Sequence, residues 1–509
     1  MRRASMKKKA LALTLACGLF ATAGCGSNND SGTSANSDGG SKSANEPVEL
    51  IWIMGDPGKV PVDQAKVEEA LNKISIPAIN VKVKTLYYDD AKTKLALSSG
   101  EQFDMVFTCE WFNNYAVQAL AGYFADITDK VKTLTPALYD TMPEVVWDGA
   151  KVNDKIYAIP VKKDYAAEIY WRFDKALFVD DLKMTVNDKM DFFEIEPFLK
   201  AAKDAWKAGD SAAANAEYPL KMTKAGFAGI ASSYDMINND AMLGIPYSAI
   251  GTADENKIVI TYEHPDLTNR LTALHKWYEA GYINKDAATV DDVGKYSAIK
   301  NGQGFYGADA IWSGGDGYTQ LISKYSGPYL STASIRGAMN AISANSKHID
   351  EALKLQELIN TNQEYRDILR YGILGEHWNK NEEGLAVRTQ LGRDNYAPWA
   401  FSQGSYSLST VEASEGVEVD PKMWEKIFDS YKDLKATNSI GFAFDITNVS
   451  AQVAAIKVIA DKYTSGLNTG TLDPATTLPK MMEELEAAGI RDVQAEAQKQ
   501  YDAYVASKK

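Results

Sequence analysis

The sequence predicts an α/β fold built around a mostly parallel sheet. Short apolar runs occur at 48–54, 80–86 and 103–108, and each is followed by a turn and a helical pattern, at 64–74, 91–97 and 115–120. Alternating strands and helices favour parallel strands with helices on both faces. The loops after such strands form a ligand crevice, here predicted at 55–59, 88–90 and 109–114.

The amino terminus has the pattern of an export signal. A basic start within residues 2–9 precedes an apolar run at 10–21, which is too short to span a bilayer. The run ends at Thr22-Ala23-Gly24-Cys25, which resembles a bacterial lipobox with Thr in place of the usual Leu. We therefore predict a signal peptide at 1–24 and a palmitate-bearing lipid anchor on Cys25. An ordinary secretory signal cleaved nearby is the alternative.

Residues 25–46 are predicted to be a disordered tether. They are almost wholly Ser, Gly, Asn, Asp, Ala, Thr and Lys, so they cannot bury enough apolar surface to fold. A flexible chain of about twenty residues reaches roughly 25 Å, which would hold a body just clear of a membrane. The body beyond it is long enough for two or three domains.

Composition excludes several classes of function. A net charge of -14 argues against nucleic acid as a partner, because clustered Lys and Arg supply most of that affinity. Cys109 is the only cysteine after the tether, so no internal disulfide is expected. The four histidines have no metal-ligand spacing, and neither a calcium loop nor a Gly-x-Ser-x-Gly elbow is present. We expect no cofactor, no metal and no catalytic residue.

The run at 302–307 has the glycine spacing of a dinucleotide fingerprint. That motif needs a strand before it and a helix opening inside it. The pattern here predicts a helix at 293–300 and a strand at 307–311, which is the reverse order. We therefore interpret 302–307 as a plain turn.

The rest of the chain continues as an α/β body. Two strands at 155–160 and 166–173, joined by the polar residues 162–164, are interpreted as a crossing between lobes. Further helices are predicted at 191–206, 266–280, 349–360, 449–463 and 477–488.

Aromatic residues beside polar groups in predicted loops suggest a carbohydrate site. The pairs are Glu110 with Trp111, Asp309 with Trp312, and Tyr396 with Trp399. A pyranose presents an apolar C–H face to an aromatic ring while its hydroxyls need polar partners. Core packing is the alternative for each ring. The remaining tryptophans lie within predicted strands or helices and are assigned to the core, namely Trp52, Trp147, Trp171, Trp206, Trp277 and Trp424.

Several stretches carry a family resemblance, namely the strand 103–107 with its polar-aromatic loop, 155–161, 339–346, 277–286 and 441–445. Together with the lipobox and tether they are similar to the carbohydrate-binding proteins of bacterial ABC importers, extracellular solute-binding family 1. The last two stretches resemble a larger Gram-positive lipoprotein subgroup with an extra C-terminal domain of uncharacterised role.

The resemblance implies a periplasmic-binding-protein-like fold, in which two α/β lobes, each with a mostly parallel sheet, close by a hinge on a ligand cleft. The N lobe would comprise 47–161 and 335–400, and the C lobe 162–334 and 401–509, including C-terminal helices. Positions matching family contacts are Asp56, Glu110, Trp111, Lys163, Asp164, Trp312, Phe444 and Asp445. The family more often has Glu at the Lys163-Asp164 position, and the calcium loop of some relatives is missing.

The sequence thus predicts a monomeric, lipid-anchored receptor on the extracellular face of the cell membrane. It would capture a carbohydrate, an oligosaccharide by preference, and deliver it to the permease subunits of an ABC importer without catalysis. An extracellular glycoside hydrolase would also need a cleft, aromatics and carboxylates. A sugar sensor acting on a membrane kinase would use the same ligand contacts.

Overall fold

A computed structural model describes residues 46–55, 60–413, 417–434 and 436–508. The predicted signal peptide, Cys25, the tether as far as residue 45, and Asp56 lie outside these residues. Residues 47–509 form one compact unit. Among the described residues, no helix is both long and apolar enough to cross a membrane.

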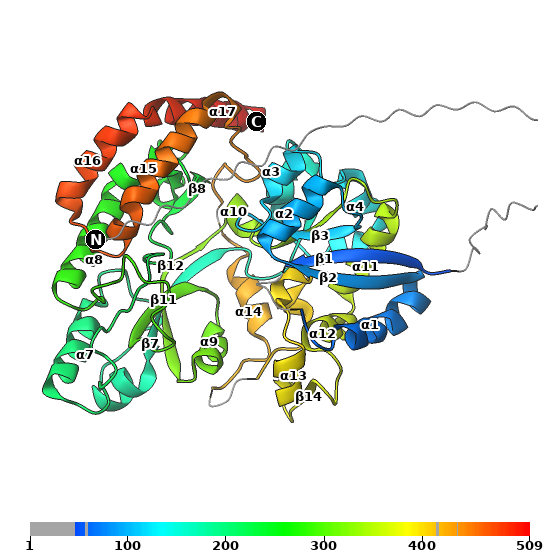
Figure 1. Cartoon of the computed structure of the whole chain (residues 1–509), viewed down its shortest axis with the longest axis horizontal. Helices are drawn as coiled ribbons and strands as arrows, with labels where there is room; N and C mark the ends of the chain where they lie inside the picture. Colours follow the sequence, from blue (N-terminus) through cyan, green and yellow to red (C-terminus); the bar gives the residue numbers. More distant parts are fainter. Residues whose placement is uncertain (1–45, 56–59, 414–416, 435, 509) are drawn as a thin grey trace, which may run out of the picture. The chain divides into compact units, whose positions relative to one another are not determined.

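The N lobe contains a five-stranded sheet in the order β2-β1-β3-β13-β6. Figure 1 labels β1, β2 and β3 of this sheet. Its strands are β1 (Val48–Gly55), β2 (Val81–Tyr88), β3 (Met105–Thr108), β6 (Ala158–Pro160) and β13 (Met339–Ile342). Strand β1 runs parallel to β2 and β3, as predicted, whereas β13 runs antiparallel to both of its neighbours. The predicted parallel arrangement is therefore confirmed for the three strands that alternate with helices.

The side chains of β1 alternate between two helix layers, as expected for a pleated strand. Leu50 and Trp52 pack against Val67 of α1 (Gln64–Ile79) and Leu353 of α11 (Ile349–Thr361). On the other face, Ile53 packs with side chains of α2 (Asp90–Ser99) and α3 (Tyr115–Leu120). Both faces of β1 are thus buried, which explains why the strand reads as a continuous apolar run.

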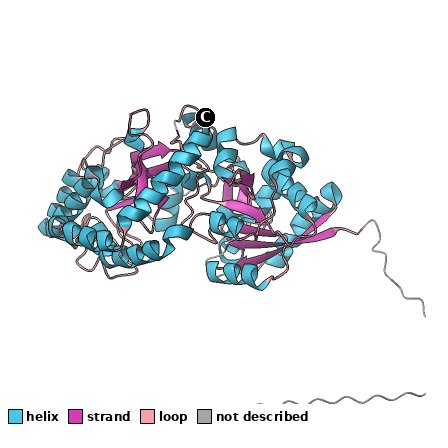
Figure 2. Cartoon of the chain, turned by 90° about the horizontal axis from the view of Figure 1, so that it is seen from above, coloured by secondary structure: helices cyan, strands magenta, loops and turns pink. Residues whose placement is uncertain are grey.

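The C lobe contains two three-stranded sheets, β11-β7-β12 and β10-β9-β8. Their strands are β7 (Ala167–Asp174), β8 (Tyr234–Asn238), β9 (Leu243–Pro246), β10 (Val259–Ile260), β11 (Ile299–Gly304) and β12 (Gln320–Tyr329). Every strand pair within these sheets is antiparallel, so the prediction of a mostly parallel sheet in this lobe is wrong. Figure 2 shows the strands gathered in two separate groups with helices around them.

The C-lobe core is closed by helices from two distant parts of the chain. These are α7 (Glu196–Ala208), α8 (Pro265–Glu279), α15 (Ser450–Asn468), α16 (Pro474–Ala487) and α17 (Ile490–Ser507). Leu271 and Trp277 of α8 share one buried cluster with Ile456 of α15, Met481 of α16 and Val493 of α17. The C-terminal helices, drawn in orange and red in Figure 1, are therefore part of this core.

The order predicted around 302–307 is wrong. Strand β11 includes Gly302 and Gly304, and α9 (Ala308–Asp316) begins directly after Gly307. Strand β11 carries mostly polar and glycine residues, so it shows no apolar alternation, and it is defined by its pairing with β7. Helix α9 contains two adjacent glycines, which disfavour a helix in isolation.

The remaining elements complete both lobes. The helices are α4 (Thr128–Leu134), α5 (Pro136–Tyr139), α6 (Glu144–Ala150), α10 (Thr332–Ile335), α12 (Gln363–Tyr371), α13 (Gln390–Asn395) and α14 (Met423–Ser430). The short strands are β4 (Lys151–Val152), β5 (Lys155–Ile156), β14 (Trp378–Lys380) and β15 (Ala386–Arg388). Short helical turns occur at Ala176–Asp181, Tyr247–Ala249, Thr261–Glu263, Ala400–Ser402, Tyr406–Leu408 and Thr447–Val449.

The chain passes between the lobes from β6 to β7, from β12 to β13, and again after α14. Trp424 and Ile427 of α14 pack in the N-lobe core with Trp147, whereas α15 packs in the C-lobe core. The lobe boundaries at 161/162 and 334/335 remain our proposal, whereas the predicted boundary at 400/401 moves to a point after α14, because α14 packs in the N-lobe core.

Candidate functional site

A cavity of about 1040 Å³ is lined by residues of both lobes. The N lobe contributes Trp111 and Phe401, and the C lobe contributes Phe227 and Trp312. The crossing segments contribute Lys163 and Asp164 on one side and Ser331 to Gly337 on the other. Glu110 also lines this cavity, so five predicted site residues, those at 110, 111, 163, 164 and 312, come together in it.

The N-lobe wall is an aromatic cluster in the loop after β3. The ring of Trp111 lies 5.8 Å from Trp399 and 5.9 Å from Phe401, centroid to centroid. Trp111 is 57% exposed, whereas Phe112 beside it is buried. The indole Nε1 of Trp111 donates to the Gly337 carbonyl at 3.2 Å. Neighbouring rings and this hydrogen bond hold the indole, while much of its apolar surface stays open to the cavity.

Two ion pairs supply the charged groups of the cavity wall. The guanidinium of Arg336 lies 3.3 Å from the Glu110 carboxylate, and the Lys163 amine lies 2.9 Å from the Asp164 carboxylate. Arg336 is almost fully buried and also donates to the carbonyls of Gly149 and Lys151 at 2.8 and 2.6 Å. Glu110 is therefore held from behind by a fixed cation, which orients its carboxylate as a hydrogen-bond acceptor.

The thiol of Cys109 lies under this wall. It is fully buried, and burial raises its pKa to about 12, so it remains a protonated thiol at neutral pH. The residue acts as a small apolar side chain beneath the aromatic loop.

Trp312 of α9 forms the facing wall of the C lobe. The guanidinium carbon of Arg172 lies 4.4 Å from the Trp312 ring centroid. Arg172 is fixed by Asp316 at 2.6 Å and Gln320 at 2.8 Å. A Cβ atom at Gly304 would lie 2.4 Å from the indole, so only glycine allows the ring this position. The cation–π contact with Arg172 and the absence of a side chain at Gly304 thus fix the position of the Trp312 ring.

Asp309, another predicted residue, begins α9 next to the cavity-lining Ala308. It is half-buried, and burial raises the pKa of its carboxyl. Its own side chain does not line the cavity.

The structure does not bring the other predicted residues to the cavity. Tyr396 is buried in the N-lobe core, where its hydroxyl donates to the Leu369 carbonyl at 3.1 Å. Trp399 supports Trp111 from outside the lining. Phe444 packs against the C-lobe core, and Asp445 lines a second, smaller cavity of about 320 Å³.

Sequence reasoning missed a recess in the C-lobe wall. Its residues are Phe227, Tyr234, Met236, Tyr247 and Asn468. The ring of Tyr247 stacks on Tyr329 at 4.0 Å with an interplanar angle of 4°. Residues 225–247 are loops and short strands without clear periodicity, so no local signal marks them as a site. Their proximity to residue 468 follows only from the tertiary fold.

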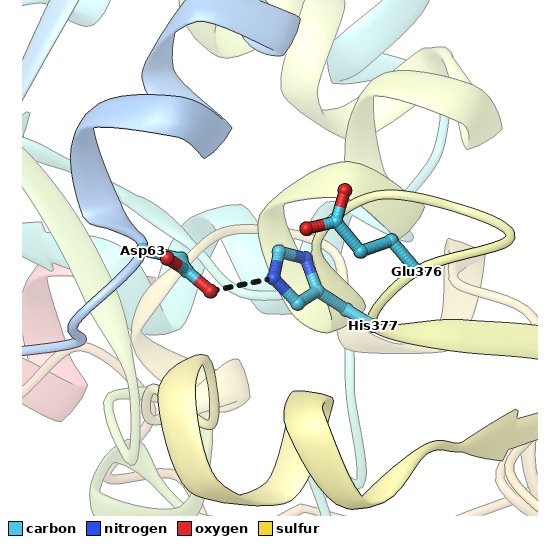
Figure 3. A group of neighbouring side chains, drawn as sticks. All are labelled: Asp63, Glu376 and His377. Carbon is cyan, nitrogen blue, oxygen red and sulfur yellow. Dashed lines mark hydrogen bonds and ion pairs between the residues drawn. The ribbon is translucent and has the colours of Figure 1, made fainter.

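Among the described residues, the ligand atoms of Asp63, Glu376 and His377 lie close enough together to hold a metal ion (Figure 3). The His377 ring is fully buried, and its Nδ1 accepts the Ile373 amide proton at 3.0 Å. The proton therefore resides on Nε2, which donates to Asp63 at 3.0 Å, as the dashed line in Figure 3 shows.

The partners of the two carboxylates complete this network. Asn395 donates to Asp63 at 2.9 Å, and this bond, followed by the one to His377, lowers the pKa of the Asp63 carboxyl. Glu376 forms an ion pair with Lys66. These hydrogen bonds and the ion pair connect the start of α1 to the turn before β14. We therefore interpret the cluster as a structural link.

Comparisons with known proteins agree with this architecture. Residues 438–506 match the model of a domain of unknown function, DUF3502. A carbohydrate ABC transporter substrate-binding protein of Streptococcus pneumoniae is 28% identical over 484 residues, covering 92% of this chain and 93% of that protein.

The solved structures of several solute-binding proteins are also similar to this chain. The N-glycan transport solute-binding protein NgtS of S. pneumoniae aligns with a TM-score of 0.79 and 26% identity over 91% of this chain and 100% of that chain. Its complex with Man5GlcNAc aligns with a TM-score of 0.70 and 27% identity over 91% and 99% of the two chains. A solute-binding protein of Bifidobacterium longum subsp. infantis, at 17% identity and a TM-score of 0.59, shares the fold over 91% and 99%. With its two lobes and its interlobe cavity, this chain is similar to the solute-binding proteins of ABC transporters, and its residues 438–506 match DUF3502.

Proposed function

We propose that this protein captures an oligosaccharide between its lobes and delivers it to the permease of an ABC importer. The observation that carries the proposal is the pairing of Trp111 from one lobe with Trp312 from the other in a single cavity. Ligand pockets commonly measure about 300–1,000 Å³, so a cavity of about 1040 Å³ has room for more than a monosaccharide. The pneumococcal relatives named for carbohydrate and N-glycan transport support this ligand class.

The charged groups would give the site its specificity. The wall carries Glu110 as an acceptor and the Lys163-Asp164 pair as donor and acceptor. A sugar with a misplaced hydroxyl would leave one of these groups without a partner, and unpaired buried polar groups are costly. Closure of the lobes would remove the bound sugar from water and stabilise the closed form.

We further propose that the protein is a receptor without catalytic activity. A glycoside hydrolase needs one carboxylic acid whose surroundings keep it protonated for the leaving group. The Glu110 and Asp164 carboxylates each have a cationic partner, Arg336 and Lys163 respectively. Such ion pairs suit hydrogen-bond acceptors rather than a general acid.

The functional test is a binding panel on the full chain. Thermal shift and calorimetry would use Man1GlcNAc, Man5GlcNAc, a neutral fructan oligosaccharide, a uronate oligosaccharide and a mixed peptide pool. We expect one saccharide class to raise Tm, because a ligand at about 100 times its Kd stabilises the native state by about 2.7 kcal/mol. Stabilisation by peptides alone would contradict the proposal, and release of reducing ends would indicate a hydrolase.

The membrane attachment is proposed from the sequence at Cys25. A lipid there would hold the receptor on the extracellular face within reach of the permease. Metabolic labelling with palmitate should mark the wild-type chain and not Cys25→Ser. Labelling of neither chain would indicate a freely secreted receptor, and equal labelling of both would place the lipid on another residue.

A further inference from the structure

The DUF3502 segment is built into the C lobe. Residues 438–506 include α15, α16 and α17. Their buried side chains, among them Leu467 and Leu485, share one cluster with Leu274 of α8 and Phe227 of the cavity wall. The DUF3502 segment therefore shares a core with a residue of the cavity wall.

The end of α15 holds part of the cavity wall in place. The amide of Phe227 donates to the backbone carbonyl of Asn468 at 2.9 Å. The hydroxyl of Ser465 donates to the Lys224 carbonyl at 3.0 Å. A Cβ atom at Gly226 would lie 2.6 Å from Cβ of Asn468, so the wall and the helix end are in close contact. The segment 224–230 therefore takes its position from the DUF3502 segment.

Asn468 itself lines the cavity. The hydroxyl of Tyr262, which is buried, donates to Oδ1 of Asn468 at 2.9 Å and so orients the side-chain amide. Within the described part of the chain, Nδ2 has no hydrogen-bond partner. An amide donor in a cavity wall gains free energy when a ligand supplies the missing acceptor. A sugar hydroxyl is such an acceptor, and the ring of Tyr247, which lines the same cavity, offers an apolar surface to the oligosaccharide.

We propose that the DUF3502 domain forms one end of the ligand cavity, where Asn468 donates a hydrogen bond from Nδ2 to a hydroxyl of the bound oligosaccharide. This inference rests on the proposed oligosaccharide function. It gives the domain two roles, as a support for the wall at 224–230 and as the source of a specificity-determining residue.

The first experiment tests Asn468 as a ligand contact. Tyr262→Phe removes the orienting hydroxyl and serves as the background, and the double variant Tyr262→Phe/Asn468→Leu then removes the amide without leaving a tyrosine hydroxyl unpaired. Calorimetry with the tightest saccharide of the panel should show binding about five- to tenfold weaker in the double variant than in the background. The Tm of the two ligand-free proteins should agree. Equal affinities would overturn the contact.

The second experiment needs no ligand and tests the wall. Gly226 and Gly209 have similar left-handed backbones, with φ of 77° and 78°, but a Cβ at Gly209 would meet nothing within 4 Å. Hydrogen exchange of the ligand-free protein should speed up at 224–230 in Gly226→Ala and stay unchanged there in the control Gly209→Ala. The same exchange in both variants would overturn the supporting role. If no saccharide binds the wild type, the proposed function fails while this experiment still decides the wall.

Discussion

At the scale of single residues, Gly304 controls how the second aromatic wall is formed. A side chain at this position would occupy the place of the Trp312 ring, which Arg172 covers at 4.4 Å. The glycine spacing at 302–307 predicts that this residue is part of a turn. In the structure it is the last residue of β11, and its lack of a side chain allows the Trp312 indole to approach closely.

Substitution of Gly304 should weaken ligand binding. Gly304→Ala places a methyl group 2.4 Å from the indole, so Trp312 must move, and overpacking of this kind costs about 1–3 kcal/mol. We expect weaker saccharide binding and an altered tryptophan near-ultraviolet signal. Gly315→Ala is the control, because a Cβ at Gly315 in α9 meets nothing within 4 Å. Unchanged affinity in Gly304→Ala would show that the ring position does not matter for binding.

Asp235 is a second residue with a measurable signature. It is buried in β8, and its Oδ2 accepts hydrogen bonds from the hydroxyls of Thr437 and Ser439. Burial raises the pKa of this carboxyl above its ordinary value of 3.8, and the two hydroxyl bonds oppose the rise. Just above that ordinary value the native state thus binds more protons than the unfolded state, so stability falls as pH rises through this window.

Asp235→Asn should remove this pH dependence. The amide has no charge to bury, so the free energy of unfolding of the variant, relative to wild type, should rise with pH above about 4 and level off once the native carboxyl is ionised. Urea unfolding of both proteins between about pH 4 and pH 8 measures the difference. A difference that stays constant, or that falls with pH, would contradict the raised pKa.

At the scale of elements, the loop between β3 and α3 carries the N-lobe contribution to the site. The ring of Phe112 in this loop lies 5.4 Å from that of Phe107 in β3, and both rings support Trp111. The loop follows the carboxyl end of a parallel strand, which is where the α/β pattern places ligand contacts.

Trp111→Ala should weaken saccharide binding by about tenfold. The estimate takes an aromatic contact as about 0.5–1.5 kcal/mol and 1.4 kcal/mol as a factor of ten. Because the side chain is largely exposed, Tm of the ligand-free protein should change little. Phe193→Ala, which removes an exposed ring outside the cavity, is the matched control. Equal loss of affinity in both variants would mean that Trp111 does not contact the sugar.

Elements were predicted unevenly. The strands and helices from 48 to 120 were predicted in order, because each has an apolar run of the right period. In the structure, Asp89 and Asn114 also cap two of these helices. The order of elements around 302–307 was predicted wrongly, because β11 is held by its pairing with β7 and lacks an apolar pattern of its own. Local signals identify an element only where its own side chains bury it.

At the scale of the whole molecule, the C lobe has one hydrophobic core made from distant segments. Leu467, Met481, Leu485, Ile490 and Val493 of the DUF3502 segment are fully buried in its core. Burial of each contributes roughly 1.5–3 kcal/mol, and together they approach the entire stability of about 5–15 kcal/mol expected for a domain.

A chain truncated after Thr437 should therefore fail to fold its C lobe. We expect loss of the cooperative unfolding transition and binding of a hydrophobic dye, measured against the full chain. A truncated protein that unfolds cooperatively and binds saccharide normally would contradict both the packing argument and the proposed role of Asn468.

Features that depend on local runs of residues could be predicted from the sequence, whereas features that depend on contacts between distant residues could not. A two-lobed α/β body and a cavity aromatic such as Trp111 could be inferred from the sequence, because strand–helix alternation and family resemblance are properties of local runs of residues. The export signal at 1–24 stays a prediction. The antiparallel sheets of the C lobe, the Gly304–Trp312 contact and the meeting of Phe227 with Asn468 could not be inferred. Those features depend on backbone pairing and close packing between residues far apart in the chain, and only the folded core brings such residues into contact.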